Sequence, residues 1–453
     1  MTFIKNYKAL TQCASQIRKD ILKILECILN NANPEEAVKR SVSITGNSLV
    51  ITDITIPLNK IKNIYVVGGG KASYKMAKAL TEILGKRITE GIISVKEAPL
   101  FRIGAIKIIK AGHPIPTEKG IEASREVIKI TDKAEEDDLI IALISGGGSA
   151  LLPYPMEDIT LSQLQKTNEL LLSSGATINE INVVRKHISM IKGGKLSDSA
   201  YPAMVISLII SDVIGDDLSS IASGPTSPDN STYEDAYSIL KKFRIESKVS
   251  SSVIETLING MNGKIPETPS LKSKVFSKTH NRIILNNLLA LKAGEKEAID
   301  SGYDTLILSS AIEGESKNAG ILHAGIAREI ASSSNPSKPP SIIFSGGETT
   351  VTLGKYSNSQ GGPNQECVTG FATKMEISDK TVFLSIDSDG IDGNSKYAGG
   401  IIGGGSPTFD NIDLSNALRT HQSTKFLERI NGVVLTGETG TNVNDIRILG
   451  VGV

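Results

Sequence analysis

The sequence predicts an α/β protein in which buried parallel strands end in glycine-rich turns. Short, strongly apolar runs precede such turns at four places: 61–67 before Gly68, 139–144 before Ser145, 342–344 before Ser345 and 381–386 before Asp387. Apolar runs of this length bounded by glycine are typical of buried strands in parallel sheets. Helical patterns lie between them, and this alternation defines the α/β class. At about 150 residues per domain, 453 residues favour two or three domains.

Apolar residues at helical spacing predict the helices. Near the N-terminus they indicate an amphipathic helix packed on the body of the protein, through Ile17, Ile21, Ile24, Leu25 and Ile28. Three further helices are expected after Lys71, over 161–175 and over 179–194, the last ending at Gly193-Gly194. Two segments rich in Ser and Pro, 226–234 and 332–341, separate the more regular parts of the chain.

Composition excludes several classes of protein. Lys plus Arg and Asp plus Glu both number 49, so no basic excess favours nucleic acid. Cys13, Cys27 and Cys367 are far apart and lack metal-ligand spacing, which favours a reducing compartment. Neither a signal-peptide pattern nor an apolar run of about 20 residues is present. We expect a cytoplasmic protein that binds neither membranes nor nucleic acid.

Two glycine turns have the form of an anion site. GGGKAS at 68–73 and SGGGS at 145–149 each lie between a predicted strand and a predicted helix. Backbone N–H groups without a neighbouring Cβ can approach an anion closely, and a helix N-terminus adds a partial positive charge. Lys71 lies inside the first turn, where its ammonium can face the same anion. The alternative is a pair of tight α/β turns that only need small residues. Neither turn is a P-loop or a complete dinucleotide fingerprint.

A basic stretch of helix precedes another strand that ends in an aspartate. Arg185, Lys186 and Lys192 lie on or near the predicted helix, and Asp212 follows the apolar run 204–210. Cations near a strand-end carboxylate suit a substrate that carries a carboxylate and a phosphate. The alternative is a solvated helix face. His187 lies between the apolar and polar faces of the helix and is interpreted as a packed histidine.

Carboxylates offer two candidate Mg²⁺ sites. One follows the run 204–210 and contains Asp212, and the other is DSDGIDG, which contains Asp387 and Asp389. Mg²⁺ takes one or two protein carboxylates together with substrate phosphates. The alternative for DSDGIDG is an Asx-rich turn. A nucleophilic hydrolase is disfavoured because the sequence has no G-x-S-x-G elbow and only five histidines.

Taken together, the motifs resemble the class II glycerate kinases. They run in order from about residue 62 to 445: GGGKAS, AGHPIPTEKG, LISGGGSALL, INVVRKHIS, IKGGKL, SDVIGDDLSSIASGPT, SGGETTVTL, GGPNQE, DSDGIDG and TGETGTNVND. The resemblance implies a Rossmann-like domain, placed at 1–235, and a C-terminal α/β domain at 236–453 with a MOFRL segment at about 340–450. The active site is then expected in the cleft between them.

The resemblance also implies the reaction and the roles of residues. The activity is ATP-dependent phosphorylation of D-glycerate at the 2-hydroxyl, which gives 2-phosphoglycerate and ADP with Mg²⁺ as the metal. Lys71 matches the catalytic lysine, and Asp212 is expected near metal or substrate, as a base or as a metal ligand. Arg185, Lys186 and Lys192 fall in the substrate-side motif. Phosphate or nucleotide contacts are implied for Gly69, Gly70, Ser145, Gly146, Gly147, Gly148, Ser149, Gly346, Gly347, Glu348, Asn364 and Gln365, and metal contacts for Asp212, Asp387 and Asp389.

One departure from the family pattern concerns Pro363, which stands where other members carry an arginine and cannot supply its charge. Two alternatives to the kinase remain: a hydroxypyruvate reductase and a non-catalytic sensor of sugar acids or nucleotides. The missing dinucleotide fingerprint disfavours the reductase, and Lys71 together with both carboxylate clusters disfavours the sensor. The expected partners are the small molecules D-glycerate and ATP, with a homo-oligomer left open.

Overall fold

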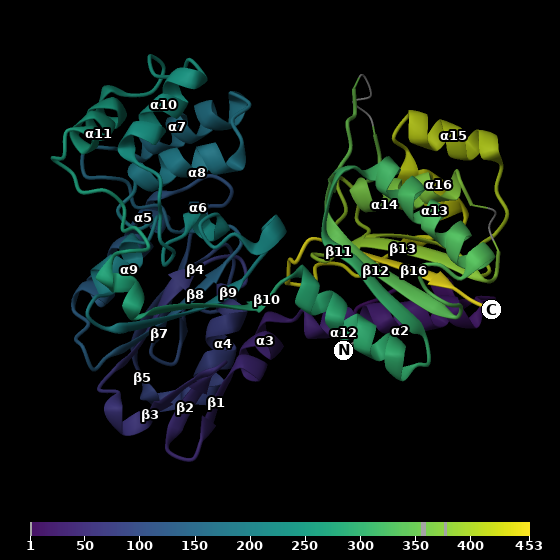
Figure 1. Ribbon diagram of the computed structural model, residues 1–453, viewed down its shortest axis with the longest axis horizontal. Coiled ribbons are helices and arrows are strands. Elements are labelled where there is room, and N and C mark those ends of the chain that lie inside the picture. The colour runs from purple at the N-terminus through teal and green to yellow at the C-terminus, as the bar shows by residue number, and fades with distance from the viewer. Residues whose placement is uncertain (1, 355–358, 376–377) are drawn as a thin grey trace. The chain divides into compact units, whose positions relative to one another are not determined.

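A computed structural model describes residues 2–354, 359–375 and 378–453 (Figure 1). The chain forms two compact units, one of Pro34–Ile284 and the other of Met1–Asn33 with Leu285–Val453. We call them the 34–284 unit and the C-terminal unit. This division differs from the boundary predicted at residue 235, because residues 236–284 pack with the first unit and the N-terminal helix packs with the C-terminal part of the chain. Its apolar face, through Ile21, Ile24 and Ile28, is fully buried, as the periodicity predicts.

The 34–284 unit is built on a seven-stranded sheet of order β10-β9-β8-β4-β5-β7-β6. β4 pairs in parallel with β5 and β8, β8 with β9 and β5 with β7, while β6 is antiparallel to β7. The strands span Ile64–Gly69 (β4), Ile88–Val95 (β5), Arg102–Ile103 (β6), Ile106–Lys110 (β7), Leu139–Ser145 (β8), Met204–Ile210 (β9) and Thr279–Leu285 (β10). β4, β8 and β9 are almost entirely buried, which explains their continuous apolar runs.

Helices and a small second sheet complete the 34–284 unit. α7, α8, α10 and α11 form a group with a core of its own, which includes Leu171, Val184 and Leu240 (Figure 1). A three-stranded antiparallel sheet consists of β1 (Val42–Thr45), β2 (Ser48–Ile51) and β3 (Ile54–Pro57). The helices are α3 (Pro34–Ser41), α4 (Ser73–Leu84), α5 (Glu118–Asp132), α6 (Gly148–Leu151), α7 (Leu161–Ser173), α8 (Ile178–His187), α9 (Lys195–Ala200), α10 (Tyr233–Lys242) and α11 (Ser251–Met261).

The helix predicted over 179–194 ends earlier than expected. α8 stops at His187, and the following residues turn back towards the 153–155 segment. Met190 N donates to the carbonyl oxygen of Tyr154 over 2.7 Å, and Ser189 forms a bridge with Pro155. These backbone bonds replace the helical ones, so Lys192 leaves the helix on which the sequence placed it.

The C-terminal unit holds a mixed six-stranded sheet of order β11-β12-β16-β13-β14-β15, in which only β11 and β12 are parallel. α2 and α12 pack on one face, and α13 and α14 with α16 lie on the other (Figure 1). The strands are β11 (Asp304–Glu315), β12 (Ser341–Thr350), β13 (Thr381–Asp387), β14 (Gly399–Gly403), β15 (Val433–Val434) and β16 (Asp445–Val451). The helices are α1 (Tyr7–Thr11), α2 (Gln16–Asn31), α12 (Asn287–Asp300), α13 (Ser316–Ser333), α14 (Pro363–Ala372), α15 (Asn411–Arg419) and α16 (Ser423–Arg429).

The sequence Ser345-Gly346-Gly347-Glu348 is not a turn, contrary to its appearance in the sequence. β12 continues through it, and Gly346 and Gly347 pair with Ile446 and Asp445 of β16. Their lack of a Cβ makes room for neighbours: a Cβ at Gly346 would lie 1.8 Å from Asn287 Oδ1. These glycines therefore serve close packing in the sheet. Among the described residues, no helix is long and apolar enough to cross a membrane.

Candidate active site

The two predicted anion turns lie side by side at the carboxyl edge of the sheet. β4 and β8 are parallel neighbours, and the chain runs from β4 to β5 on one side and from β8 to β9 on the other. Such a switch in direction is where open α/β sheets bind ligands. The Lys71 amide donates to the carbonyl oxygen of Gly146 over 2.9 Å, and the Ala72 amide donates to Ser145 Oγ over 3.0 Å. The turns thus form one backbone platform.

Glycine in the second turn lets the carboxylate of Asp212 approach the backbone. A Cβ at Gly146 would lie 1.8 Å from Asp212 Oδ2, and one at Gly147 would lie 3.2 Å from Lys71 Cγ. Gly147 also has a φ of +80°, a conformation that favours glycine. Burial raises the pKa of Asp212, and the positive charge of Lys71 partly opposes this rise. Lys71, the second turn and Asp212 are therefore gathered around one point.

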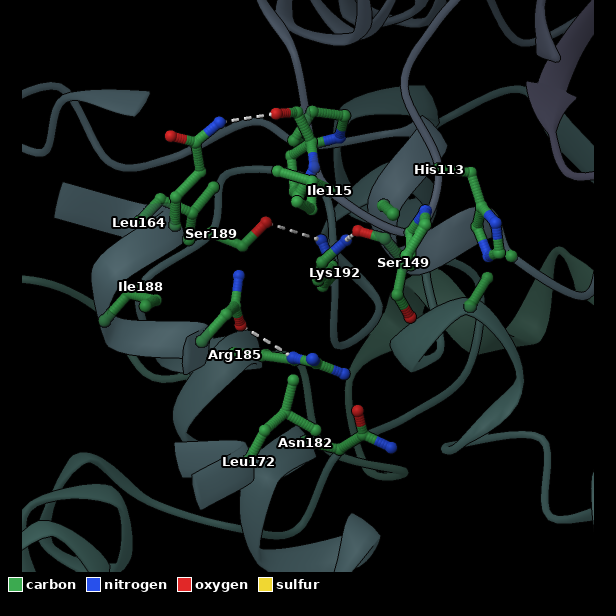
Figure 2. A pocket seen from close by; sticks show the side chains of 18 of the residues that line it. His113, Ile115, Ser149, Leu164, Leu172, Asn182, Arg185, Ile188, Ser189 and Lys192 are labelled. Atoms are coloured by element: carbon green, nitrogen blue, oxygen red, sulfur yellow. Dashed lines mark hydrogen bonds between the residues drawn. The ribbon is translucent and has the colours of Figure 1, made fainter. Parts of the chain in front are cut away.

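A cavity of about 790 Å³ opens from this point (Figure 2). Its lining belongs entirely to the 34–284 unit and includes six of the residues predicted from sequence: Gly146, Gly147, Ser149, Arg185, Lys192 and Asp212. Gly69, Gly70, Ser145 and Gly148 are buried beneath it, and their smallness allows the turns and strands to pack closely. The expectation of a site between the two domains stays a prediction.

Arg185 offers a guanidinium fork to the cavity. Its Nε donates to Asn168 Oδ1 on α7 over 2.8 Å, and this is the hydrogen bond that the side chain makes within the described residues. Figure 2 shows the side chain reaching from α8 into the pocket, with its terminal nitrogens beyond the bond to Asn168. Burial lowers the pKa of Arg185. A fork held through Nε keeps both terminal nitrogens for a carboxylate or phosphate.

The other two predicted cations are engaged in the protein itself. Lys192 is almost fully buried, and its Nζ donates to the carbonyl oxygens of Ser149 and Leu152 over 2.8 and 3.2 Å. It thereby satisfies carbonyls at the end of α6, the short helix that follows the second turn. Lys186 does not line the cavity. It forms a buried ion pair with Asp229, with 3.3 Å between Nζ and Oδ1.

A chain of side-chain hydrogen bonds supports the back of the cavity. Ser149 Oγ lies 2.8 Å from Ser223 Oγ, which donates to Asn182 Oδ1 over 3.0 Å. Ala222 and Ser223 have φ values of 53° and 61°, in the left-handed region that costs energy for residues other than glycine. The strained turn fixes Ser223 where it can hold both Ser149 and Asn182.

Sequence reasoning missed several lining residues. His113, from the motif AGHPIPTEKG, lines the cavity, and burial together with the charge of Lys71 lowers its pKa. Asn168 and Asn182 lie on the cavity-facing sides of α7 and α8, where an amide is unremarkable in a sequence. His187 is fully buried and packs edge-on against Tyr233, which confirms its interpretation as a packed histidine.

The predicted residues of the C-terminal unit bind one another. Asp392 accepts hydrogen bonds from the backbone amides of Asn364 and Gln365 over 3.0 and 2.9 Å, and so caps α14. The amide nitrogen of the Asn364 side chain reaches Asp445 Oδ1, and that of Gln365 reaches Asp392 and Ser395. Pro363 takes the first position of the helix, where its missing N–H costs nothing. These bonds leave the two amides occupied in the fold.

The candidate metal cluster of the C-terminal unit has the geometry of a turn. Asp387 Oδ1 accepts from the backbone amide of Asp389, and Asp389 Oδ1 accepts from that of Ile391. This is the Asx-rich turn considered as the alternative for DSDGIDG. Burial, followed by the charge of Asp389, raises the pKa of Asp387. Within the described ranges, no three His, Cys, Asp or Glu side chains form a group that could hold a metal ion.

The fold and cavity define a two-domain α/β protein with a cavity at the glycine turns of a Rossmann-like sheet, and comparisons with known proteins identify its family. Residues 20–258 match the domain of unknown function DUF4147, and residues 341–445 match the MOFRL family. A glycerate 2-kinase of Pyrococcus horikoshii is 40% identical, over 96% of this chain and 97% of its own length. A putative hydroxypyruvate reductase of Agrobacterium vitis is 39% identical, over 85% of this chain and 99% of its own.

A solved structure gives the same assignment. The crystal structure of a glycerate kinase from Thermotoga maritima superposes with a TM-score of 0.84 at 34% identity, covering 96% of this chain and 99% of that one. The chain belongs to the class II glycerate kinase family.

Proposed function

We propose that the protein phosphorylates D-glycerate at its 2-hydroxyl, with ATP as the donor and 2-phosphoglycerate and ADP as products. The observation that carries this proposal is that the Gly146–Gly147 turn, Asp212 and Arg185 line one cavity, with the Lys71 side chain beside Gly147 although it is not part of the lining. The names of the relatives, glycerate 2-kinase and glycerate kinase, support the same reaction.

Phosphoryl transfer asks a protein mainly for positioning and for stabilisation of charge. In the proposed reaction the C2 oxygen of D-glycerate forms a bond to the γ-phosphorus, the bond from this phosphorus to the bridging oxygen of ADP breaks, and the hydroxyl proton is released. In this proposal Lys71 and the backbone amides of the Gly146–Gly147 turn stabilise negative charge on the γ-phosphoryl oxygens, because the amides of Lys71 and Ala72 already donate within the protein. Because these amides are fixed by the strands beneath them, they need no rearrangement during the reaction.

Arg185 is the residue that we assign to the carboxylate of glycerate. Of the three cations in the basic stretch, it alone both lines the cavity and keeps its terminal nitrogens for a ligand within the described structure. Lys192 instead holds the carbonyls at the end of α6, and Lys186 pairs with Asp229. A fork that holds the carboxylate also holds the neighbouring C2 hydroxyl close, whereas the C3 hydroxyl lies farther out.

The residues present fit a Mg²⁺ ion that arrives with the nucleotide. Asp212 is a half-buried carboxylate whose burial favours a cation beside it, and Mg²⁺ needs only one or two protein carboxylates when phosphates supply other ligands. Asp212 would hold the ion, which supplies further neutralisation of phosphate charge. The absence of a three-residue metal group among the described residues is consistent with this mode of binding.

A coupled assay tests the function and the site of phosphorylation. The protein is incubated with ATP, Mg²⁺ and D-glycerate in the presence of enolase and pyruvate kinase, with and without phosphoglycerate mutase. Enolase uses 2-phosphoglycerate directly, so pyruvate is expected at the full rate without the mutase. Pyruvate that forms only with the mutase would show phosphorylation at the 3-hydroxyl. Oxidation of NADH with hydroxypyruvate, measured separately, would support the reductase instead.

A further inference from the structure

The cavity is much larger than D-glycerate needs, and its lining contains two chemically different sets of residues. Its volume of about 790 Å³ lies in the range of sites for drug-sized ligands, whereas glycerate has seven non-hydrogen atoms. One set consists of the glycine turn and Asp212. Elsewhere three large apolar side chains are unusually exposed, Ile115 at 64%, Leu172 at 62% and Ile178 at 55%. A small hydroxy acid has no apolar surface to cover them.

α8 presents an ordered series of groups to this cavity. Ile178, Asn182 and Arg185 all line it, and their spacing of four and three residues places them along one side of the helix. At a rise of 1.5 Å per residue the series covers about 10 Å. Leu172, near the end of α7, lies a few residues before Ile178 along the chain. Along α8 the lining therefore changes from an apolar group to an amide and then to a cation.

Asn182 is a buried polar group with one end fixed. Its side chain is only 3% exposed, and its Oδ1 accepts the hydrogen bond from Ser223. This bond uses the oxygen, so the side-chain nitrogen is left to donate to a ligand in the cavity that Asn182 lines. Ser223 is itself held by the left-handed turn at 222–223, so the donor is preorganised.

We propose that the cavity wall formed by Leu172, Ile178 and Asn182 is the subsite for the purine base of the phosphoryl donor. This inference rests on the proposed function, in which the donor is ATP. The flat base covers the two apolar side chains, and Asn182 donates to a ring nitrogen. The polyanionic end of the same molecule extends to Lys71 and the Gly146–Gly147 turn. A nucleotide matches this lining because it joins a flat, largely apolar base to a chain of phosphates, and Ile115 lines the same cavity from another segment (Figure 2).

The test measures the contribution of the base to binding separately from that of the phosphates. Dissociation constants for ATP, and for inorganic tripolyphosphate as a probe without a base, are measured by calorimetry on the wild type, Leu172→Gln and Ile178→Gln. Because both side chains are exposed, neither change removes a core contact. The matched control is Leu271→Gln, at a leucine of the same unit that is 68% exposed and does not line the cavity.

Leu172→Gln and Ile178→Gln are each expected to raise the dissociation constant for ATP about tenfold, because a partly covered leucine or isoleucine contributes binding energy on this scale. Tripolyphosphate binding and the KM for D-glycerate should stay within about twofold of wild type, as should every constant of the control. Asn182→Asp, which keeps the acceptor for Ser223 but loses the donor, should also weaken ATP more than tripolyphosphate.

Three results would overturn the subsite: unchanged ATP affinity in both apolar variants, an equal loss of ATP and tripolyphosphate binding in them, or a raised KM for D-glycerate in place of weaker ATP binding. Wild-type protein that binds ATP no more tightly than tripolyphosphate overturns it as well. Failure of the proposed function is recognised separately, because the coupled assay would then yield no pyruvate while the differences in ATP binding persist.

Discussion

The backbone amide of Lys71 donates a 2.9 Å hydrogen bond to the carbonyl oxygen of Gly146, so the turn after β4 is fixed to the turn after β8. The side chain of Lys71 is exposed, and its charge acts on both Asp212 and His113. The backbone position of Lys71 is thus determined by the fold, whereas its side chain is available for a ligand.

Lys71→Ala is expected to leave the fold intact and lower kcat by about 10²–10³-fold. Loss of one charge contact made in the transition state has an effect of this size in comparable sites. Steady-state kinetics and circular dichroism measure the two expectations, with Lys86→Ala as the control at an exposed lysine outside the cavity. A folded Lys71→Ala variant with nearly normal kcat would remove Lys71 from the mechanism.

Arg185→Ala is expected to raise the KM for D-glycerate roughly 10- to 100-fold, because a charged hydrogen-bonding partner of the carboxylate is lost. Asn168→Ala should raise this KM less strongly, because the variant keeps the Arg185 guanidinium and loses only the hydrogen bond by which Asn168 positions it. Arg125→Ala, at an exposed arginine on α5 outside the cavity, is the control. If Arg185→Ala instead weakens only the binding of ATP, the Arg185 guanidinium binds a phosphate of ATP and not the carboxylate of D-glycerate.

Lys186→Met is expected to destabilise the 34–284 unit without changing the KM for D-glycerate in the protein that remains folded. The change leaves Asp229 buried without its cation, which costs about 3–5 kcal/mol in comparable pairs. Urea denaturation of the wild type, the single variant and the Lys186→Met/Asp229→Asn double variant measures the effect. The double variant should recover part of the loss. A raised KM for D-glycerate with an unchanged free energy of unfolding would instead indicate that Lys186 binds the substrate.

The lowered pKa of Lys192 should be visible in how the free energy of unfolding depends on pH. Burial, with a smaller contribution from Arg185, lowers its pKa from 10.5 to about 7. Between these values the unfolded chain binds a proton that the folded protein lacks, so the contribution of Lys192 to stability rises with pH from about 7 to 10.5. A difference of one bound proton raises the free energy of unfolding by at most about 1.4 kcal/mol per pH unit. Lys192→Met should flatten the rise in urea stability between pH 7 and 9, and an unchanged profile would contradict the assignment.

The sequence predicted most strands and helices because their patterns are local. α4 and α7 follow the predicted periodicity, and the strands before Gly68 and Ser145 are buried as their apolar runs require. The early end of α8 was not predictable in this way. It depends on backbone bonds from 189–190 to Tyr154 and Pro155, which are distant in sequence.

The same limit applies to the site. Residue type and spacing linked Arg185 with Asp212 and Lys71 with the glycine turns, and the family resemblance joined the two groups in one site. They could not distinguish Arg185 from Lys186 or Lys192, because the partners that occupy the two lysines, Asp229 and the carbonyls at the end of α6, come from other parts of the chain. Nor could a glycine pair show that Gly346 and Gly347 lie inside a strand.

Asp212 and Asp387 belong to the two different candidate metal sites, so variants at these two positions can distinguish between the sites. Asp212 lines the cavity beside the glycine turn, whereas Asp387 holds the backbone of its own turn through Asp389. Asp212→Asn keeps the size of the side chain but removes the charge that Mg²⁺ requires. We expect it to lower kcat/KM at least about 100-fold and to raise the Mg²⁺ concentration for half-maximal activity. Asp387→Asn should change neither by more than a few fold, although it can lower stability.

Activity measured against total Mg²⁺ at fixed ATP, together with thermal melting of each variant, tests this comparison. A larger kinetic effect in a stable Asp387→Asn protein would assign the metal to the C-terminal unit. Loss of activity in Asp212→Asn with an unchanged Mg²⁺ requirement would instead indicate that Asp212 accepts the proton of the C2 hydroxyl. In that case the rate should also fall as pH drops through the raised pKa of Asp212, because the protonated carboxyl can no longer accept a proton.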